Sequence, residues 1–382
     1  MSMVLFPRRV AMPPCLNYPK TTTQARPLPW IWNHQMARQP KNSIAIIGAT
    51  GVVGRTVAEI LQTRLTSPYA LHLLASSRSA GSPLLIGDQQ YTVESLEDAS
   101  LENHDIIFSC AGNSIARQIA PGAVQHGAWF IDSSSAFRMD PSVPLVIPEV
   151  NLQLLKKLQR PQIIASPNCS TTLALVAVNP IREAVGIERM VISTYQAASG
   201  GGRALMEELE NQIHDHATGQ PYRLAALDRP YLLNVFSHET PIGDDGYNGE
   251  ERKVIDETRK IWEEPEACVT ATCVRVPVLR SHCESITLTL RAPLTVEDAR
   301  VLIDQAPGLA LCDDPKNGRF PEPINASGQD DILVGRIRMD QSQPEGIGLQ
   351  LFLSGDQLRK GAALNACQIA ETLIANDPSL HT

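Results

Sequence analysis

The amino-acid sequence predicts a two-domain α/β protein, in which a parallel-sheet domain is joined to an α+β domain with a mixed sheet. A β-rich run, a glycine turn and a helical run follow one another between Ser43 and Arg64. Strand-like and helical runs then alternate as far as Ala165, as a parallel sheet with crossover helices requires. Beyond Ser170 several strand-like runs alternate apolar and polar residues, which is typical of a mixed or antiparallel sheet with one buried face.

Length and composition limit the class of protein. The 382 residues suffice for two or three domains, and 43% hydrophobic with 19% charged residues is typical of a soluble globular chain. We find no apolar run of about 18 residues, so a membrane-spanning helix is not expected. A net charge of −8 argues against nucleic-acid binding, which needs a basic face.

The charge is unevenly distributed. Residues 1–42 contain six basic and no acidic residues, which leaves 27 basic against 41 acidic residues in the remainder. We predict that residues 1–42 form an extension outside the folded core. An organelle transit peptide and a true start at Met36 both stay open as explanations, and we otherwise expect a cytoplasmic protein.

The first domain opens with a nucleotide-binding pattern. Ser43–Ile47 reads as a strand, Gly48-Ala-Thr-Gly-Val-Val-Gly54 as a turn, and 55–64 as a helix. This order predicts a Rossmann-type dinucleotide-binding domain, with Gly48, Gly51 and Gly54 at the cofactor. The spacing is GxxGxxG rather than GxGxxG, and a tight turn that needs positive φ is the alternative.

The remaining runs complete the two domains. We predict that 43–169 and 355–382 form the NADP-binding domain, because the last helix, 357–376, packs back on it. The substrate and dimerisation domain is predicted over 170–354. Its expected strands are 190–196, 267–276, 284–291, 332–338 and 348–353.

The loop after the second predicted strand indicates the nucleotide. A site that prefers NAD usually places an acid on the ribose 2′-hydroxyl, but no acid occurs between Glu59 and Asp88. Ser76, Arg78 and Ser79 offer hydroxyls and a guanidinium, which suit a 2′-phosphate. The loop therefore predicts NADP(H), and a solvated loop arginine is the alternative.

Cys169 is the candidate nucleophile among eight scattered cysteines. It follows Ser166-Pro-Asn168 at the predicted start of an apolar helix, where the helix dipole and free N–H groups favour a thiolate and can hold an oxyanion. The other cysteines fit small buried core residues in a reducing compartment. No CxxC pair occurs, and we expect no metal.

His282, in a predicted loop between two strands, is the candidate general acid/base. A thiol, a histidine and NADP(H) together suggest oxidation of an aldehyde through a thiohemiacetal to a thioester. In reverse, an acyl phosphate acylates the cysteine and the thioester is reduced to an aldehyde.

Several motifs in order resemble the bacterial aspartate-semialdehyde dehydrogenase family from Ser43 to about Ala375. They are the glycine turn, Ser-Arg-Ser-Ala-Gly81, Ser-Ala-Phe-Arg138, Pro-Leu-Val-Ile-Pro-Glu-Val-Asn151, Asn-Cys-Ser-Thr-Thr172, Tyr-Gln-Ala-Ala-Ser-Gly200, Arg-Val-Pro-Val-Leu-Arg-Ser-His282 and Val-Gly-Arg-Ile-Arg338. Residues 1–42 match nothing in the family pattern.

The resemblance implies reduction of L-aspartyl-4-phosphate to L-aspartate 4-semialdehyde by NADPH, with release of inorganic phosphate, on the route to lysine, threonine, methionine and diaminopimelate. It implies that Cys169 is acylated and that His282 is the acid/base. It further implies Gln196, Glu250 and Arg275 as substrate ligands, Arg138 and Lys253 as phosphate ligands, and Thr50, Val52, Val53, Arg78, Ser79, Ser199, Gly200 and Asn365 as cofactor contacts.

Two alternatives remain open. N-acetyl-glutamyl-phosphate reductase uses a related fold and the same cysteine–histidine chemistry, but its acylated nitrogen has no use for a carboxylate at Glu250. A non-catalytic NADP-binding regulator is the other alternative. The family resemblance also implies a homodimer or homotetramer, with small molecules rather than nucleic acid or membrane as further partners.

Overall fold

Six parallel strands form the first sheet of the computed structural model, which describes residues 42–102 and 104–376. The prediction for 1–42 lies outside the described residues, apart from Asn42 at the start of β1. The strand order is β5-β2-β1-β6-β7-β8, and every pairing is parallel, which confirms the predicted sheet. The strands are β1 (Asn42–Ile47), β2 (Tyr69–Ala75), β5 (Glu94–Ser95), β6 (Ile106–Ser109), β7 (Trp129–Asp132) and β8 (Ile163–Ala165).

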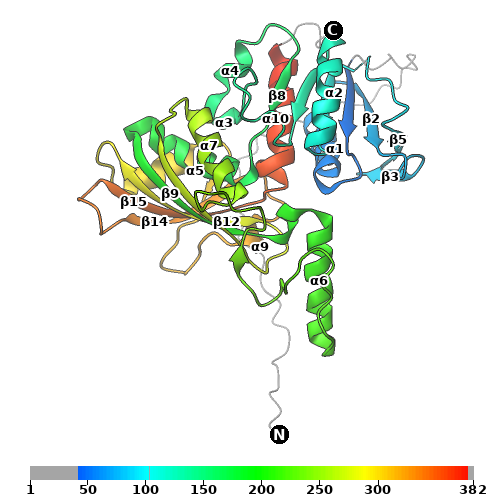
Figure 1. Ribbon diagram of the computed structural model, residues 1–382. Coiled ribbons are helices and arrows are strands. Elements are labelled where there is room, and N and C mark those ends of the chain that lie inside the picture. The colour runs from blue at the N-terminus through cyan, green and yellow to red at the C-terminus, as the bar shows by residue number, and fades with distance from the viewer. Residues whose placement is uncertain (1–41, 103, 377–382) are drawn as a thin grey trace, which may run out of the picture. The chain divides into compact units, whose positions relative to one another are not determined.

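Helices cover both faces of this sheet, so its central strands are largely apolar. Ile44 and Ile46 of β1 share one core with α1 (Val52–Arg64) and α10 (Leu364–Asn376). Ala45 and Ile47 point to the opposite face, where they share a core with α2 (Asn113–Gln125). Figure 1 shows α10, in red, beside this sheet.

The second sheet is mixed, also as predicted, with the order β10-β11-β9-β12-β15-β14-β13. Strand β9 pairs in parallel with β11 and antiparallel with β12. Helices α5, α7 and α8 pack on one face. The elements are α5 (Cys169–Val185), β9 (Ile187–Gln196), β10 (Phe236–Ser237), α7 (Gly249–Trp262), β11 (Cys268–Arg275), β12 (His282–Leu290), α8 (Val296–Gln305), β13 (Leu309–Leu311), β14 (Ile332–Met339) and β15 (Gly348–Gly355).

Smaller elements connect these layers. They are β3 (Pro83–Ile86), β4 (Gln89–Thr92), α3 (Pro148–Asn151), α4 (Gln153–Lys156), η1 (Ala198–Gly201), α6 (Arg203–Thr218) and α9 (Pro323–Ala326). The predicted last helix is divided in two, because a π-helical turn, η2 (Arg359–Ala363), precedes α10.

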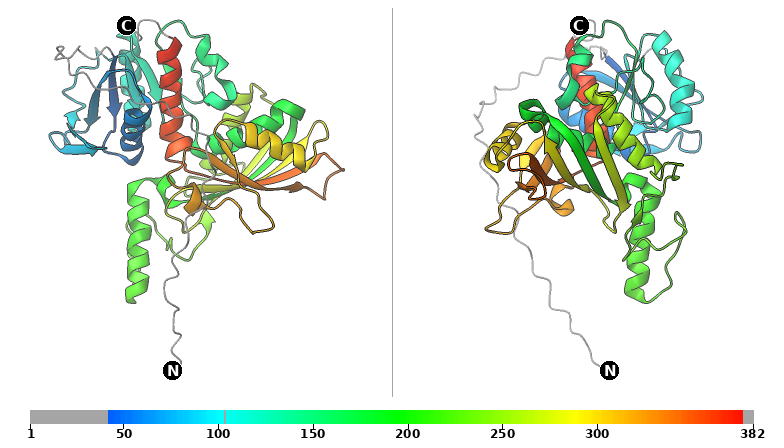
Figure 2. Two further views of the ribbon diagram at one scale, coloured as in Figure 1. Left: turned by 180° about the vertical axis from the view of Figure 1, so that it is seen from behind. Right: turned by 60° about the vertical axis from the view of Figure 1, so that its left-hand side comes forward.

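The segment from β15 to α10 joins the two sheets. Its π-turn η2 contacts both α1 beside the parallel sheet and α5 beside the mixed sheet. Both views in Figure 2 show α10, in red, running up from the mixed sheet along the parallel sheet. The division of the chain at 169/170 and 354/355 stays a prediction. What the fold establishes is that the C-terminal segment meets both sheets beside Cys169.

Candidate active site

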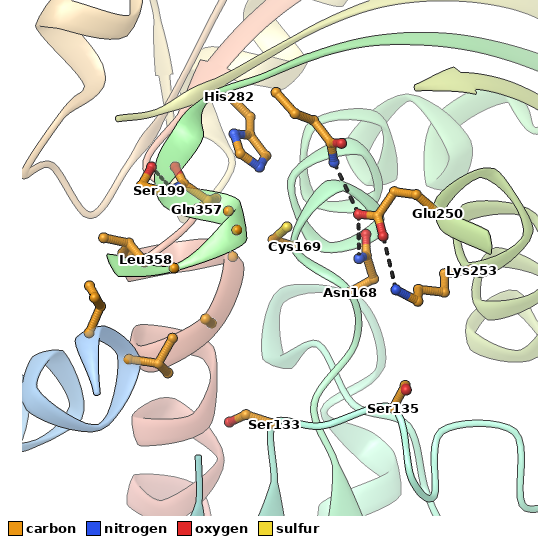
Figure 3. A pocket seen from close by; sticks show the side chains of 18 of the residues that line it. Ser133, Ser135, Asn168, Cys169, Ser199, Glu250, Lys253, His282, Gln357 and Leu358 are labelled. Atoms are coloured by element: carbon orange, nitrogen blue, oxygen red, sulfur yellow. Dashed lines mark hydrogen bonds and ion pairs between the residues drawn. The ribbon is translucent and has the colours of Figure 1, made fainter. Parts of the chain in front are cut away.

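A pocket of about 540 Å³ brings together residues of the mixed sheet and residues that directly follow strands of the parallel sheet. Cys169, His282, Gln196, Glu250 and Arg275 all line it, and so do Arg138 and Lys253. In Figure 3, Cys169 lies at the centre, with His282 above it and Glu250 and Lys253 to one side. The structure therefore collects every substrate and catalytic residue that the sequence predicted.

Cys169 is the first residue of α5, as predicted, but its pKa is opposite to the prediction. Burial and the nearby Glu250 carboxylate raise the pKa of the thiol to about 12, against the opposing effects of Arg138 and Arg275. The prediction that this position lowers the thiol pKa is therefore wrong for this structure. Helix position favours the anion, but desolvation in this pocket is the larger effect.

The N–H groups at the start of α5 are also less available than predicted. The Asn168 Oδ1 atom accepts hydrogen bonds from the Ser170 and Thr171 amides at 3.0 and 3.3 Å, so Asn168 is a side-chain N-cap. The Thr172 amide donates to the Asn168 carbonyl at 2.9 Å. The amides of Ser170, Thr171 and Thr172 are therefore engaged within the protein, and the prediction of an oxyanion site at this helix start now depends on the Cys169 amide.

Two glycines allow backbone to lie against the reacting groups. A Cβ at Gly361 would come within 2.8 Å of the Cys169 Cβ, and one at Gly200 within 2.9 Å of the His282 ring. Gly200 was predicted from the family resemblance. Gly361, on η2, was missed, because its role depends on a contact with a residue far earlier in the chain.

His282 is the first residue of β12 rather than part of a loop. The Ala197 amide donates to its Nδ1 atom at 3.0 Å, so the neutral ring carries its proton on Nε2. That buried Nε2 atom has no hydrogen-bond partner among the described residues. Burial, assisted by Arg275, lowers the pKa of His282 to about 3. In this structure His282 is therefore a neutral donor.

Glu250 is the centre of a buried polar cluster. Its Oε1 atom accepts from Asn168 Nδ2 at 2.8 Å and from Gln196 Nε2 at 3.0 Å, while Lys253 Nζ lies 3.0 Å from Oε2. Burial acts to raise the pKa of Glu250, but Lys253, His238 and the two amides together lower it below its usual range. Glu250 is therefore an ionised carboxylate facing the pocket.

Arg275 is engaged by a carboxylate that the sequence analysis missed. Its Nε atom donates to Glu239 Oε2 at 2.9 Å and its Nη2 atom donates to Glu239 Oε1 at 2.5 Å. Arg275 also donates to the Ala197 carbonyl at 3.2 Å. Glu239 lies between β10 and α7, and only the folded chain shows its pairing with a residue 36 positions later.

Arg138 is also held by protein groups. Its Nε donates to the Ser166 carbonyl and its Nη2 to the Ser133 carbonyl, both at 2.9 Å, while Nη1 pairs with Glu257 at 2.9 Å. Glu257 also accepts from the Asn168 amide at 2.6 Å. The sequence analysis missed Glu257, although helical spacing from Glu250 and Lys253 places all three on one face of α7.

The side of the pocket that is predicted to hold the cofactor is formed by the glycine turn and η1. Gly51, Val52, Val53, Ser199 and Gly200 line the pocket. The N-cap of α1 makes no side-chain hydrogen bond, and its first turn holds no acid. These features fit a dinucleotide pyrophosphate, which binds free N–H groups at a helix N-terminus.

Gly48 and Gly54 give the turn its shape. Gly48 has φ +81°, and a Cβ there would come within 2.8 Å of the Cys110 carbonyl oxygen. A Cβ at Gly54 would come within 2.4 Å of the Gly48 carbonyl oxygen. Side chains at either position would force the turn open, so both glycines are required by the fold as well as predicted at the cofactor.

The other predicted cofactor residues are not among those that line this pocket. Ser76 and Arg78 are exposed and Ser79 is half-buried, all in the turn after β2, and Thr50 is exposed. An acid also reaches this turn from a later segment, because the Ser77 amide donates to Glu97 Oε2 at 3.2 Å. This contact could not be predicted from the loop itself, because Glu97 comes 20 residues after Ser77 in the sequence.

Asn365 is placed differently from the prediction. It is 0% exposed, and its Nδ2 atom donates to the Val146 carbonyl at 2.9 Å and to Ser166 Oγ at 3.0 Å. Its Oδ1 atom accepts from the buried Lys360 at 3.1 Å. In this structure Asn365 therefore ties α10 to the strand ends rather than presenting atoms to the pocket.

Among the residues that the structure describes, histidine, cysteine and acidic side chains form no group that could hold a metal. None of the described helices combines the length and apolar character needed to cross a membrane.

Comparisons with known proteins identify the family. Residues 43–158 match the model of the semialdehyde dehydrogenase NAD binding domain, and 178–360 match that of its dimerisation domain. An aspartate-semialdehyde dehydrogenase from Synechocystis sp. is 45% identical over 331 residues, 87% of this chain and 97% of the relative. Its counterpart from Aquifex aeolicus is 43% identical over 87% of this chain and 97% of its own.

Solved structures agree with these sequence matches. An aspartate semialdehyde dehydrogenase II from Vibrio cholerae, solved in complex with ASA, gives a TM-score of 0.84 at 38% identity and covers 89% of this chain and 99% of its own. A probable aspartate-semialdehyde dehydrogenase from Pseudomonas aeruginosa gives 0.82 at 27% identity, over 88% and 99%. The chain belongs to the semialdehyde dehydrogenase family, and its relatives are aspartate-semialdehyde dehydrogenases.

Proposed function

We propose that this chain reduces L-aspartyl-4-phosphate to L-aspartate 4-semialdehyde through a thioester on Cys169. One observation supports this most strongly: a thiol, a neutral imidazole, an arginine and an ionised carboxylate line one pocket beside an uncapped glycine turn. The substrate has an electrophilic carbonyl, a carboxylate and an ammonium group, and each has a chemically matched residue there.

The chain's residues have distinct roles in the proposed reaction. The Cys169 sulfur attacks the acyl carbon, the carbon–oxygen bond to phosphate breaks to leave a thioester, and the thiol proton leaves with the departing phosphate. Arg138 and Lys253 would attract the phosphate. Arg275 would bind the α-carboxylate in a bidentate manner, and Glu250 would pair with the α-ammonium.

His282 would donate its Nε2 proton to the oxygen that becomes negative in each half of the reaction. NADPH, when bound, supplies the hydride that reduces the thioester. Collapse of the resulting thiohemiacetal releases the aldehyde and regenerates the cysteine. Gln196, held between Ser170 Oγ at 2.7 Å and Glu250 at 3.0 Å, would fix the orientation of the acyl group.

The phosphate-bearing cofactor is proposed to be NADP(H). The uncapped start of α1 would hold the pyrophosphate, and Arg78 with Ser76 and Ser79 would face the 2′-phosphate. The match to a dimerisation domain supports an oligomer, which we propose is a homodimer or homotetramer in the cytoplasm.

The test is phosphate-dependent reduction of NADP⁺ by L-aspartate 4-semialdehyde, compared with N-acetyl-L-glutamate 5-semialdehyde. We expect turnover with the first aldehyde, preference for NADP⁺ over NAD⁺, and a thioacyl adduct on Cys169 detectable by mass spectrometry. Turnover with only the N-acetylated aldehyde would identify the reductase alternative. Binding of NADP(H) without turnover of either aldehyde would identify a regulator.

A further inference from the structure

We propose that Glu239 is an internal carboxylate that occupies the substrate-carboxylate site of Arg275 and must be displaced when substrate binds. This inference rests on the proposed function, in which Arg275 binds the α-carboxylate. It assigns to Glu239 the role of a competing internal ligand, which keeps Arg275 paired without substrate and weakens the binding of ligands that carry this carboxylate.

The first observation is the geometry of the ion pair between Glu239 and Arg275. Glu239 uses both oxygens on the Nε–Nη2 edge of Arg275, at 2.9 and 2.5 Å. That side-on edge matches a single carboxylate. A third donor of Arg275, Nη1, is directed to the Ala197 carbonyl at 3.2 Å. A substrate carboxylate therefore cannot occupy the same edge until Glu239 leaves it.

The second observation is that the side chain of Glu239 is much more exposed than that of Arg275. The side chain of Arg275 is 2% exposed, whereas that of Glu239 is 37% exposed. A buried guanidinium without a counter-ion would be strongly unfavourable, but a released Glu239 can be solvated. The exchange of one carboxylate for another thus keeps Arg275 paired throughout.

The third observation is that Glu239 lies inside the pocket. Both Glu239 and Arg275 line the pocket that contains Cys169 and His282, so the pair lies inside the site rather than on an outer surface. A ligand without a carboxylate gains nothing by displacing Glu239. A ligand with one must replace Glu239 on Arg275, so Glu239 lowers the affinity for such ligands while it keeps Arg275 paired in their absence.

The test compares Glu239→Gln with wild type in two measurements. The first is the KM for L-aspartate 4-semialdehyde and for 3-aminopropanal, which lacks the α-carboxylate. The second is calorimetric affinity for L-aspartate and for β-alanine, which lacks the same group and needs no turnover. Asp245→Asn is the matched control. It removes a negative charge from the same segment, but Asp245 pairs with Arg252 rather than with Arg275.

We expect Glu239→Gln to lower the KM for the semialdehyde and the Kd for L-aspartate by roughly fivefold, because a partly exposed ion pair no longer competes. The two ligands without the α-carboxylate should change by less than about twofold, and Asp245→Asn should change none of the four values. Glu239→Asp, one methylene shorter, should lie between wild type and Glu239→Gln.

Any other result contradicts either the proposed role of Glu239 or the proposed function on which it rests. Unchanged or weaker binding of L-aspartate in Glu239→Gln would overturn the proposal, since Glu239 would then support Arg275 rather than compete for it. Equal gains for all four ligands would also overturn it, because they would show a general charge effect. Wild type that binds L-aspartate but does not oxidise the semialdehyde would refute the proposed function, and the L-aspartate affinities would still decide the role of Glu239.

Discussion

Two helix N-termini border the pocket, and they are built in opposite ways. The start of α1 has Gly51 as its N-cap and makes no side-chain hydrogen bond there. The start of α5 is capped by Asn168, whose side chain accepts from the Ser170 and Thr171 amides. An uncapped terminus leaves N–H groups for a ligand anion, whereas a capped terminus uses them for stability. Thus one terminus suits the cofactor, and the other fixes the nucleophile in place.

The largest expected effect separates the two termini by function. Cys169→Ala should reduce turnover by roughly 10⁴-fold or more, because the covalent step is lost. NADP(H) affinity, measured by fluorescence titration, should change by less than about twofold, since a small side chain at the start of α5 leaves the α1 terminus intact. Retained turnover in this variant would remove Cys169 from the proposed mechanism.

The second-largest expected effect comes from a substitution at the start of α1, which should weaken cofactor binding. Val52→Asp should raise the Kd for NADPH by at least about tenfold, because a carboxylate would repel the pyrophosphate at close range. The same charge should raise the thermal stability of the free protein slightly, since an acid in the first turn favours a helix. Val52→Asn is the uncharged control. Equal losses of affinity in both variants would indicate a steric cause instead.

Removal of the cap should mainly affect stability. Asn168→Ala should lower the free energy of unfolding by about 1–2 kcal/mol, because two amides of α5 lose their acceptor. Glu250 also loses the donor at 2.8 Å, so the loss should be at the upper end of this range. Denaturant unfolding would measure it. A loss below about 0.5 kcal/mol would show that the cap contributes little here.

The smallest effect concerns the thiol itself. With a pKa of about 12, Cys169 should be alkylated by iodoacetamide more slowly than the exposed Cys268 in the same sample at neutral pH. The Cys169 rate should rise with pH, because the thiolate fraction grows until the pH reaches the pKa. Glu250→Gln should speed the reaction by a few-fold at fixed pH, since the Glu250 charge raises that pKa. Peptide mass spectrometry gives both rates, and a fast pH-independent Cys169 would contradict this prediction.

The contrast also shows what a single sequence can predict. The strand, glycine turn and helix from Ser43 to Arg64 are local, so the Rossmann-type domain could be predicted from periodicity and glycine placement. The position of Cys169 at the start of a helix could also be predicted from its neighbours in the sequence. The raised pKa of its thiol could not, because that pKa depends on burial and on Glu250, which comes 81 residues later in the sequence.

Long-range pairs account for the other differences. Glu239 on Arg275, Glu257 on Arg138 and Gly361 against Cys169 each join segments that are distant in the sequence. Asn365 was predicted from family resemblance, yet its amide is used between α10 and the strand ends. Spacing along one element finds residues on a shared face, as for α7, but it does not show which distant segment meets that face.

The position of Gly361 against Cys169 has a consequence for biosynthesis. The nucleophile precedes the π-turn that covers it by about 190 residues, and the helix that fills one side of the first core follows that turn. A nascent chain therefore carries an uncovered thiol and an open apolar sheet face until this later segment has been made. Synthesis of η2 and α10, rather than completion of the first sheet, is the point at which this site can form.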